Sequence, residues 1–153
     1  MSFRILSAAI TLWALPRLAW AQERTIARAK LPPAVERAVV QQSQGATIRG
    51  FAKEIEHGQT LYEMELNVAG RTTDVTMDST GAVVLLEEEV PLDSLAPAVQ
   101  QAIKAQAGTA TIGMVERLTK GDKVVAYEAH VTAKGKRREI QVGPNGEKLD
   151  HEE

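Results

Sequence analysis

The feature that most constrains this chain is an internal repeat at an offset of about 64 residues. Leu-Pro-Pro-Ala-Val at Leu31–Val35 returns as Leu-Ala-Pro-Ala-Val at Leu95–Val99. With one residue inserted, the pair Tyr62-Glu63 returns as Tyr127-Glu128. Because a repeat of this length corresponds to one supersecondary unit, it predicts two similar units, one after the other.

A helix is predicted at the start of each copy. Pro33 and Pro97 suit the first turn of a helix, where the backbone N–H groups have no partner inside the helix. Apolar residues follow at the i, i+3 and i+4 spacing of an amphipathic helix. In the two copies these residues are Val35, Ala38 and Val39, and Val99, Ala102 and Ile103. We expect both apolar stripes to be buried against a sheet.

After each helix the hydrophobic period changes from about 3.6 to 2, which predicts strands. Apolar and polar residues alternate over residues 62–68 and 127–133, and again over 73–77 and 138–142. Asn145-Gly146 is a strong hairpin signal. The predicted fold class is α+β: two tandem repeats, each one helix packed on an antiparallel sheet of about four strands. The opposite face of each sheet is then left in water.

The first 21 residues are predicted to be a signal peptide. Arg4 is the positive start, Ile5–Leu15 the apolar run, and Ala19-Trp20-Ala21 a cleavage signal with small residues. The apolar run is about half of the roughly 20 residues that a membrane-spanning helix needs. We expect a periplasmic or secreted protein with no transmembrane segment after signal removal. The chain has no cysteine, so it forms no disulfides.

The rest of the chain divides at two points. Residues 22–30 have mixed charge and no long apolar period, so we expect a flexible lead. Val90-Pro91 is the expected joint between the copies, because proline ends a strand. These boundaries place repeat 1 at residues 31–90 and repeat 2 at residues 91–153.

The charge of the mature chain excludes one class of partner. Removal of residues 1–21 takes away two arginines and leaves 16 basic and 20 acidic side chains, a net charge of −4. Nucleic-acid-binding domains are basic, so no nucleic-acid partner is expected. Residues 31–90 carry 4 basic and 10 acidic side chains, so most of the negative charge is in the first copy.

The order of these elements resembles PepSY-like domains, and more closely the tandem secreted proteins described as β-lactamase-inhibitor-like PepSY-like. The resemblance rests on Pro-Ala-Val at 33–35 and 97–99, on the two Tyr-Glu strands, and on the turn Asp78–Gly81. It covers residues 31–153. It implies a small extracytoplasmic binding or inhibitory module, and it supplies no catalytic residues. The second turn departs from the pattern because it begins with Gly143.

No catalytic set or cofactor fingerprint is found in the sequence. The turn Asp78–Gly81 is similar to an aspartic-protease loop, but such a site needs two carboxylates, and Gly143 stands at the matching position. We interpret the segment as a turn initiated by its aspartate. Since no activated nucleophile is recognised either, we expect neither enzyme activity nor a cofactor.

The charged runs are interpreted as solvated surface. Glu87–Glu89 and Asp150–Glu153 are linear, whereas a hard cation needs six or more oxygens from a folded loop. We interpret them as charge that protects strand edges from pairing. The three histidines lack ligand spacing, so no metal site is predicted. The basic cluster Lys134–Arg138 is interpreted as a solvated hairpin.

The predicted function is that of an exported, non-enzymatic module that binds an unknown protein partner. One module of this kind is a protease- or hydrolase-inhibitor-like protein. Broad polar surfaces suit protein partners, whereas small-molecule sites are concave and mostly apolar. The predicted partner-binding residues, on the sheet faces away from the helices, are Glu63, Glu65, Asp74, Glu128, His130, Arg137 and Glu139. A face that is only solvated is the competing interpretation. The alternative function is an envelope sensor or ligand-delivery protein that binds a metal ion or small anion.

Overall fold

The computed structural model describes residues 24–151 and 153, so the predicted signal peptide lies outside the described residues. The helices are α1 (Pro33–Gln42) and α2 (Pro97–Ala107), with short 3-10 turns η1 (Arg28–Lys30) and η2 (Leu92–Ser94). The strands are β1 (Arg24–Thr25), β2 (Thr47–Glu56), β3 (Gln59–Val68), β4 (Arg71–Asp78), β5 (Val83–Glu89), β6 (Thr111–Lys120), β7 (Lys123–Ala133) and β8 (Lys136–Val142).

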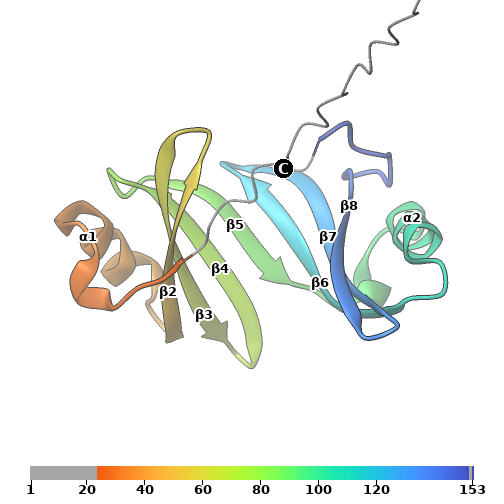
Figure 1. Ribbon diagram of the computed structural model, residues 1–153, viewed down its shortest axis with the longest axis horizontal. Coiled ribbons are helices and arrows are strands. Elements are labelled where there is room, and N and C mark those ends of the chain that lie inside the picture. Colours follow the sequence, from red (N-terminus) through yellow and green to blue (C-terminus); the bar gives the residue numbers. More distant parts are fainter. Residues whose placement is uncertain (1–23, 152) are drawn as a thin grey trace, which may run out of the picture.

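All of these strands belong to one antiparallel sheet of eight strands, which follow one another in chain order (Figure 1). The prediction of two tandem repeats, each with its own sheet of about four strands, is therefore wrong. Residues 86–89 of β5 pair with residues 116–119 of β6 and join the halves. The physical reason is that an isolated sheet leaves a row of unpaired N–H and C=O groups at its edge, and this pairing satisfies them.

Both ends of the chain also differ from the expected pattern. Residues 24–30, expected to be a flexible lead, contribute β1 and η1, and β1 pairs with β2 at the edge of the sheet. Residues 147–151, which belong to a predicted repeat of about four strands, contain bends and no strand. The second half therefore supplies only β6 to β8, and β5 of the first half lies beside β6.

The two helices lie on the same face of the sheet, on the outer side of its curve, one near each end (Figure 1). Side chains of the predicted stripes are fully buried beneath them: Val35, Val39, Val99 and Ile103 all have 0 % exposure. This part of the prediction is confirmed. Burial of a valine or isoleucine side chain contributes about 1.5–3 kcal/mol, so these residues hold each helix on the sheet.

The core consists of two clusters, one under each helix. Under α1 the strands contribute Phe51, Tyr62, Met64, Leu66, Val75 and Met77. Under α2 they contribute Val115, Ala129, Val131, Ile140 and Val142. Between the two clusters, on the same face, Glu88 of β5 forms an ion pair with Arg117 of β6. The helix side of the sheet is thus apolar under each helix and charged at the junction.

One glycine in each half lets a turn approach its helix closely. Gly81 and Gly146 have φ angles of +83° and +84°. A Cβ atom at either position would lie 2.6 Å from a backbone oxygen of the adjacent helix, that of Ala34 or Ala98. Only glycine combines this backbone conformation with such a close approach. The two turns therefore fix the distance between helix and sheet in the same way.

Candidate functional site: an acidic open face

The face of the sheet away from the helices is called here the open face. Residues opposite one another in neighbouring antiparallel strands share a face, so the strand register identifies its members. Glu65, Asp74 and Glu87 lie side by side across β3, β4 and β5. A second row runs across β5 to β8 through Glu89, Glu116, Glu128 and Gln141. The open face is therefore acidic on both sides of the β5–β6 junction.

The register brings all seven predicted partner-binding residues onto this one face. Glu63 and Glu65 lie on β3, Asp74 on β4, Glu128 and His130 on β7, and Arg137 and Glu139 on β8. They differ in exposure. Glu65, Arg137 and Glu139 are exposed, Glu63, Asp74 and His130 are half-buried, and Glu128 is buried.

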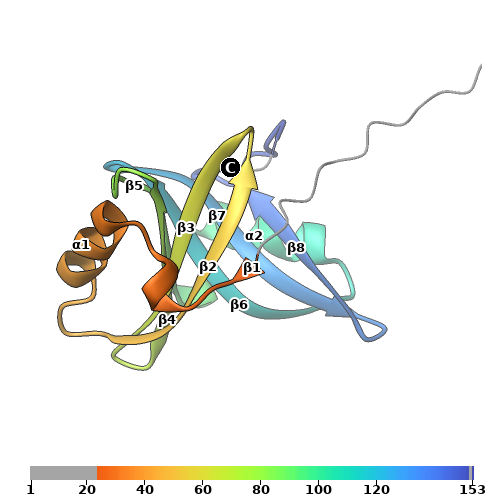
Figure 2. The same ribbon diagram turned by 60° about the vertical axis from the view of Figure 1, so that its left-hand side comes forward.

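The residues are also not one contiguous patch. Arg137 pairs with Thr132 near the tip of the β7–β8 hairpin. Glu63 and Glu65 both lie on β3, on the other side of the β5–β6 junction. Figure 1 shows this separation, with β3 on the side of α1 and β8 on the side of α2. In Figure 2, β2 and β3 pass in front of β6 and β7 because the sheet is curved. What connects the two groups is a set of acidic side chains between them.

Two residues of this connecting set, Glu87 and Glu116, were not among the predicted site residues. Glu87 was interpreted as edge-protecting charge, but β5 is a central strand whose neighbours are β4 and β6, so that interpretation is wrong. Glu116 stands in a segment whose alternation is poor because β6 is irregular. The signal that could have found both residues is the pairing of β5 with β6, and no local pattern contains that pairing.

The most enclosed part of the open face surrounds His130. Its Nε2 atom lies 2.8 Å from Oε2 of Glu116 and 3.5 Å from Oε1 of Glu128. Its Nδ1 atom lies 3.6 Å from Oε1 of Glu139. Glu116 and Glu128 have only 3 % and 8 % exposure, although no helix covers this face. The side chains are enclosed because the sheet curves inward here.

Burial changes the acidity of this cluster. Loss of hydration and, to a smaller extent, the negative charges of Glu116, Glu128, Glu63 and Asp74 together raise the pKa of Glu87 to about 8. Loss of hydration also raises the pKa of Glu128, although the hydrogen bond that Glu128 accepts from Gln141 acts to lower it. The centre of the open face therefore holds carboxyl groups that resist losing their protons.

The C-terminal residue reaches the same region. The backbone N–H of Glu153 donates to Oε1 of Gln141 at 2.8 Å, and Nε2 of Gln141 donates to Oε2 of Glu128 at 2.8 Å. The Glu153 side chain forms an ion pair with Lys120 at 3.1 Å. The side chain of Glu128 is thus held by a chain of hydrogen bonds that ends at the C-terminus.

The other charged motifs have structural roles. Oδ1 of Asp78 accepts hydrogen bonds from the backbone N–H groups of Thr80 and Ala82, which confirms the interpretation as an aspartate-initiated turn. The basic cluster Lys134–Arg138 is exposed at a hairpin, as expected. One of its members, Arg138, donates to the backbone oxygen of Gln106 at the end of α2.

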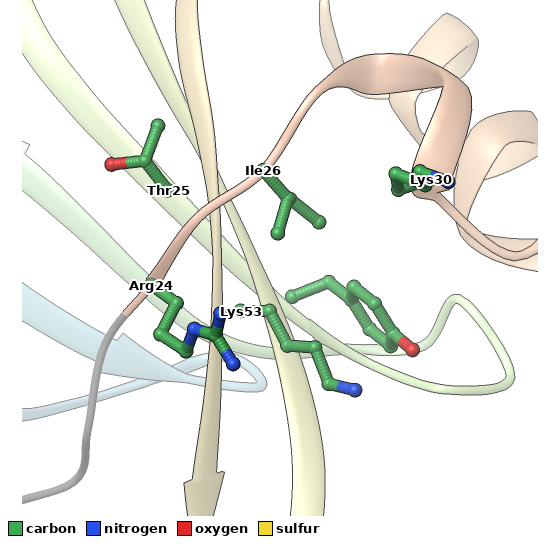
Figure 3. Close-up of a pocket in the computed structure, with 6 residues that line it drawn as sticks. Arg24, Thr25, Ile26, Lys30 and Lys53 are labelled. Atoms are coloured by element: carbon green, nitrogen blue, oxygen red, sulfur yellow. The ribbon is translucent and has the colours of Figure 1, made fainter.

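A separate hollow lies at the edge of the sheet, beneath β1. It has a volume of about 360 Å³ and is lined by Arg24, Thr25, Ile26, Lys30, Lys53 and Tyr62. Figure 3 shows Ile26 and the aliphatic part of Lys53 on opposite sides of this space. Since Lys53 pairs with Tyr62, whose side chain belongs to the core under α1, the hollow lies on the helix side of the sheet.

Comparisons with known proteins give the fold. No family model matches the chain, and no curated protein matches it. A DUF2874 family protein from Bacteroides ovatus is 19 % identical, with a TM-score of 0.59 over 79 % of this chain and 86 % of that one. A BLIP-like protein from Bacteroides fragilis is 20 % identical, with a TM-score of 0.54 over 78 % and 83 %.

A third solved structure, from Bacteroides eggerthii, is of a protein whose description places it provisionally in the periplasm. It is 19 % identical, with a TM-score of 0.60 over 76 % of this chain and 84 % of that one. Among residues 24–151 and 153, no helix is both long and apolar enough to span a membrane. The chain is therefore similar in fold to a DUF2874 family protein, to a BLIP-like protein and to a protein described provisionally as periplasmic.

Proposed function

We propose that this protein is an exported, non-enzymatic binding module that engages a protein partner through the acidic open face. The observation that carries the proposal is the register, because it places all seven predicted partner-binding residues on one face of one sheet. The helices occupy only the other face. A broad polar surface of this kind suits a protein partner better than a small molecule.

The charge of the face indicates the chemistry of the partner. Glu63, Glu65 and Asp74 of the first half continue through Glu87 to Glu116 and Glu128 of the second. Such a surface attracts a basic partner and raises its association rate, an effect that salt reduces. We infer that the partner presents lysine or arginine side chains to the open face.

The similarity in fold supports a binding role. One neighbour is described as BLIP-like, a description that applies to that protein and that fits a module acting by contact. Inhibition of a hydrolase is the form of binding that this likeness suggests for the present chain. A protease- or hydrolase-inhibitor-like activity is therefore the first one to assay once a partner is identified.

Charge reversal on the open face tests this proposal. Partners are captured from an envelope extract on the immobilised wild-type protein and on the double variant Glu63→Lys, Glu65→Lys. We expect the double variant to lose the captured partner, and the wild-type association rate to fall as salt is added. A control variant, Glu36→Lys with Asp93→Lys, makes the same change in net charge at positions outside the sheet.

The comparison of these two variants decides the proposal. Both should keep the wild-type melting temperature to within a few degrees, because the exposed Arg28–Glu36 pair lost in the control contributes little. Equal retention of the partner by wild type and both variants would place the site elsewhere, at the strand edges or hairpin tips. Equal loss of the partner in both variants would indicate that capture depends on the net charge of the protein and not on the open face.

We also propose that export removes residues 1–21 and leaves a periplasmic or secreted protein that begins at Gln22. The proposal rests on the sequence of that segment and is supported by the neighbour described as periplasmic. The intact mass of the protein recovered from the envelope fraction tests it. A mass that includes Met1 to Ala21 would contradict it.

The alternative function, a metal sensor or ligand-delivery protein, is favoured by one observation. This observation is the cluster of Glu116, Glu128 and His130 on the open face. The cluster is a different set of residues from the acidic runs and the basic hairpin described in the sequence.

A further inference from the structure

Three potential metal ligands converge on the open face from two adjacent strands. Glu116 on β6 pairs directly with Glu128 on β7, and His130 follows two residues later on the same face. One donor atom from each of the three side chains lies within 4.8 Å of the other two. The backbone positions of the three residues are fixed by the hydrogen bonds between β6 and β7. The three residues do not lie in a loop.

The distances are close to those of a tetrahedral transition-metal site. Zinc binds histidine nitrogen and carboxylate oxygen at about 2.0–2.2 Å, which separates two donors by roughly 3.3–3.5 Å. Nε2 of His130 already lies 3.5 Å from Oε1 of Glu128. Its 2.8 Å distance to Oε2 of Glu116 would have to widen by about half an ångström. Two of the three donor separations are thus within about half an ångström of those in a coordination shell, and the donors of Glu116 and Glu128 lie within 4.8 Å of each other.

The second ring nitrogen of His130 is also placed as in metal sites. A metal-bound histidine usually directs its other N–H group to a carboxylate or carbonyl, which fixes the ring. Here Nδ1 lies 3.6 Å from Oε1 of Glu139, which pairs with His130 across β7 and β8. Glu128 is in turn held by Gln141. Both the ring and one of the two carboxylates thus have outer partners.

In the described part of the chain, no lysine or arginine balances the carboxylates of this cluster. Among the described residues, no lysine or arginine forms an ion pair with Glu87, Glu116 or Glu128, and His130 is the only cationic type of side chain in contact with the last two. Buried carboxylates are costly unless they bind protons, cationic side chains or metal ions.

The first half of the molecule is a natural comparison. At the offset of the internal repeat, Ala52 stands where Glu116 stands and Glu63 where Glu128 stands, while Glu65 takes the position of His130. In that half β2 pairs with β3 as β6 pairs with β7, yet these positions hold neither a histidine nor a buried carboxylate. The ligand set is therefore not a consequence of the fold.

We propose that Glu116, Glu128 and His130 form a binding site for a first-row divalent transition-metal ion of the zinc class. The histidine nitrogen favours such an ion over calcium or magnesium, which prefer oxygen donors in larger number. Three protein ligands would leave a fourth position for water or another ligand. This inference does not depend on the proposed protein partner.

Titration of the full mature chain, prepared without a histidine tag and freed of metal with a chelator, tests the site. We expect one zinc ion to bind per chain by calorimetry, and cobalt(II) at the same site to give the intense visible absorption of a tetrahedral complex. His130→Ala and Glu116→Gln should each weaken zinc binding at least about tenfold. The control variant His57→Ala, which removes a side chain with 90 % exposure, should bind as wild type does.

A second measurement protects the test against variants that fail to fold. In the wild-type protein, added zinc should shift the NMR signals of the His130 ring and leave those of His57 in place. Three outcomes would overturn the proposal: no stoichiometric zinc binding, binding that survives both ligand substitutions, or calcium binding that equals zinc binding in strength. If partner capture is repeated with a chelator present, failure of the metal site leaves the binding-module proposal independently testable.

Discussion

The two halves of the molecule agree on the helix side of the sheet and differ on the open side. On the helix side, Val35 and Val39 of α1 match Val99 and Ile103 of α2 in position and in complete burial. Gly81 and Gly146 make the same close approach to a helix backbone oxygen. The helix side is therefore determined by packing, which limits the residues that each position accepts.

On the open side, matched positions carry different chemistry. The first half has exposed Glu65 where the second has His130, and it has Ala52 where the second has buried Glu116. The strand pairing is the same at these positions, since Ala52 pairs with Glu63 as Glu116 pairs with Glu128. The comparison teaches that residues which vary between the halves are the place to look for specific binding.

The largest expected effect tests the matched helix side. Gly81→Ala and Gly146→Ala each force an L-residue into positive φ, which costs about 1–2 kcal/mol. Each also brings a Cβ to 2.6 Å from a helix oxygen, which adds roughly 1–3 kcal/mol of overpacking. Chemical denaturation should show that each variant loses about 2–4 kcal/mol of unfolding free energy. A large loss in only one half would break the comparison.

The matched control uses the hairpin glycines Gly70 and Gly135. Their φ angles are also positive, at +90° and +75°, but a Cβ at either position would meet nothing within 4 Å. Gly70→Ala and Gly135→Ala should therefore cost only the backbone term of about 1–2 kcal/mol. If all four variants lose the same amount, the close contact between turn and helix contributes nothing.

A smaller effect tests the open side through Glu87. Its pKa of about 8 in the folded protein exceeds the ordinary value of 4.5, so folding favours the protonated form. The contribution of this group to stability is complete below pH 4.5, falls as the pH rises, and is lost above about pH 8. Glu87→Gln should flatten this fall and raise the free energy of unfolding at pH 8 by at least about 1 kcal/mol.

Denaturation of metal-free protein from pH 4.5 to 8 measures this effect. The difference between wild type and Glu87→Gln isolates Glu87 from His130, which stays in both proteins. A variant whose pH dependence equals that of wild type would show that the carboxyl group of Glu87 is hydrated and ionised in the folded state. The acidic cluster would then be open to water and not enclosed by the curve of the sheet.

The elements of this fold that local patterns encode were predictable from the sequence. The stripe of α1 and α2 and the alternation of β3 and β7 depend on residues close in the chain. The single sheet was not predictable, because pairing of β5 with β6 joins residues about 30 positions apart through backbone groups that every sequence has. Poor alternation in β6, which contains bulges, hid its position in that pairing.

The candidate site was predictable in part for the same reason. Glu63, Glu65, Asp74 and Glu139 could be assigned to a face because period 2 fixes the side on which each side chain lies. The cluster around His130 needs Glu116 from a different strand, and spacing along the chain does not bring these residues together. Chemistry that depends on neighbouring strands becomes visible only when the strand order is known.

The smallest expected effect concerns the junction between the halves. Arg117 on β6 donates to Glu88 on β5 at 2.6 Å, and this hydrogen bond raises the pKa of the arginine. Both side chains remain partly exposed, at 40 % and 34 %. Exposed ion pairs contribute about 0–1 kcal/mol, so the paired backbones of β5 and β6 should hold the junction.

A double-mutant cycle with Arg117→Ala and Glu88→Ala measures this pair. We expect a coupling energy below about 1 kcal/mol for this partly exposed pair. Backbone hydrogen bonds between β5 and β6 survive both substitutions, so denaturation should remain a single transition. A coupling of several kcal/mol, or separate unfolding of the two halves in the double variant, would show that the ion pair and not the backbone pairing unites the sheet.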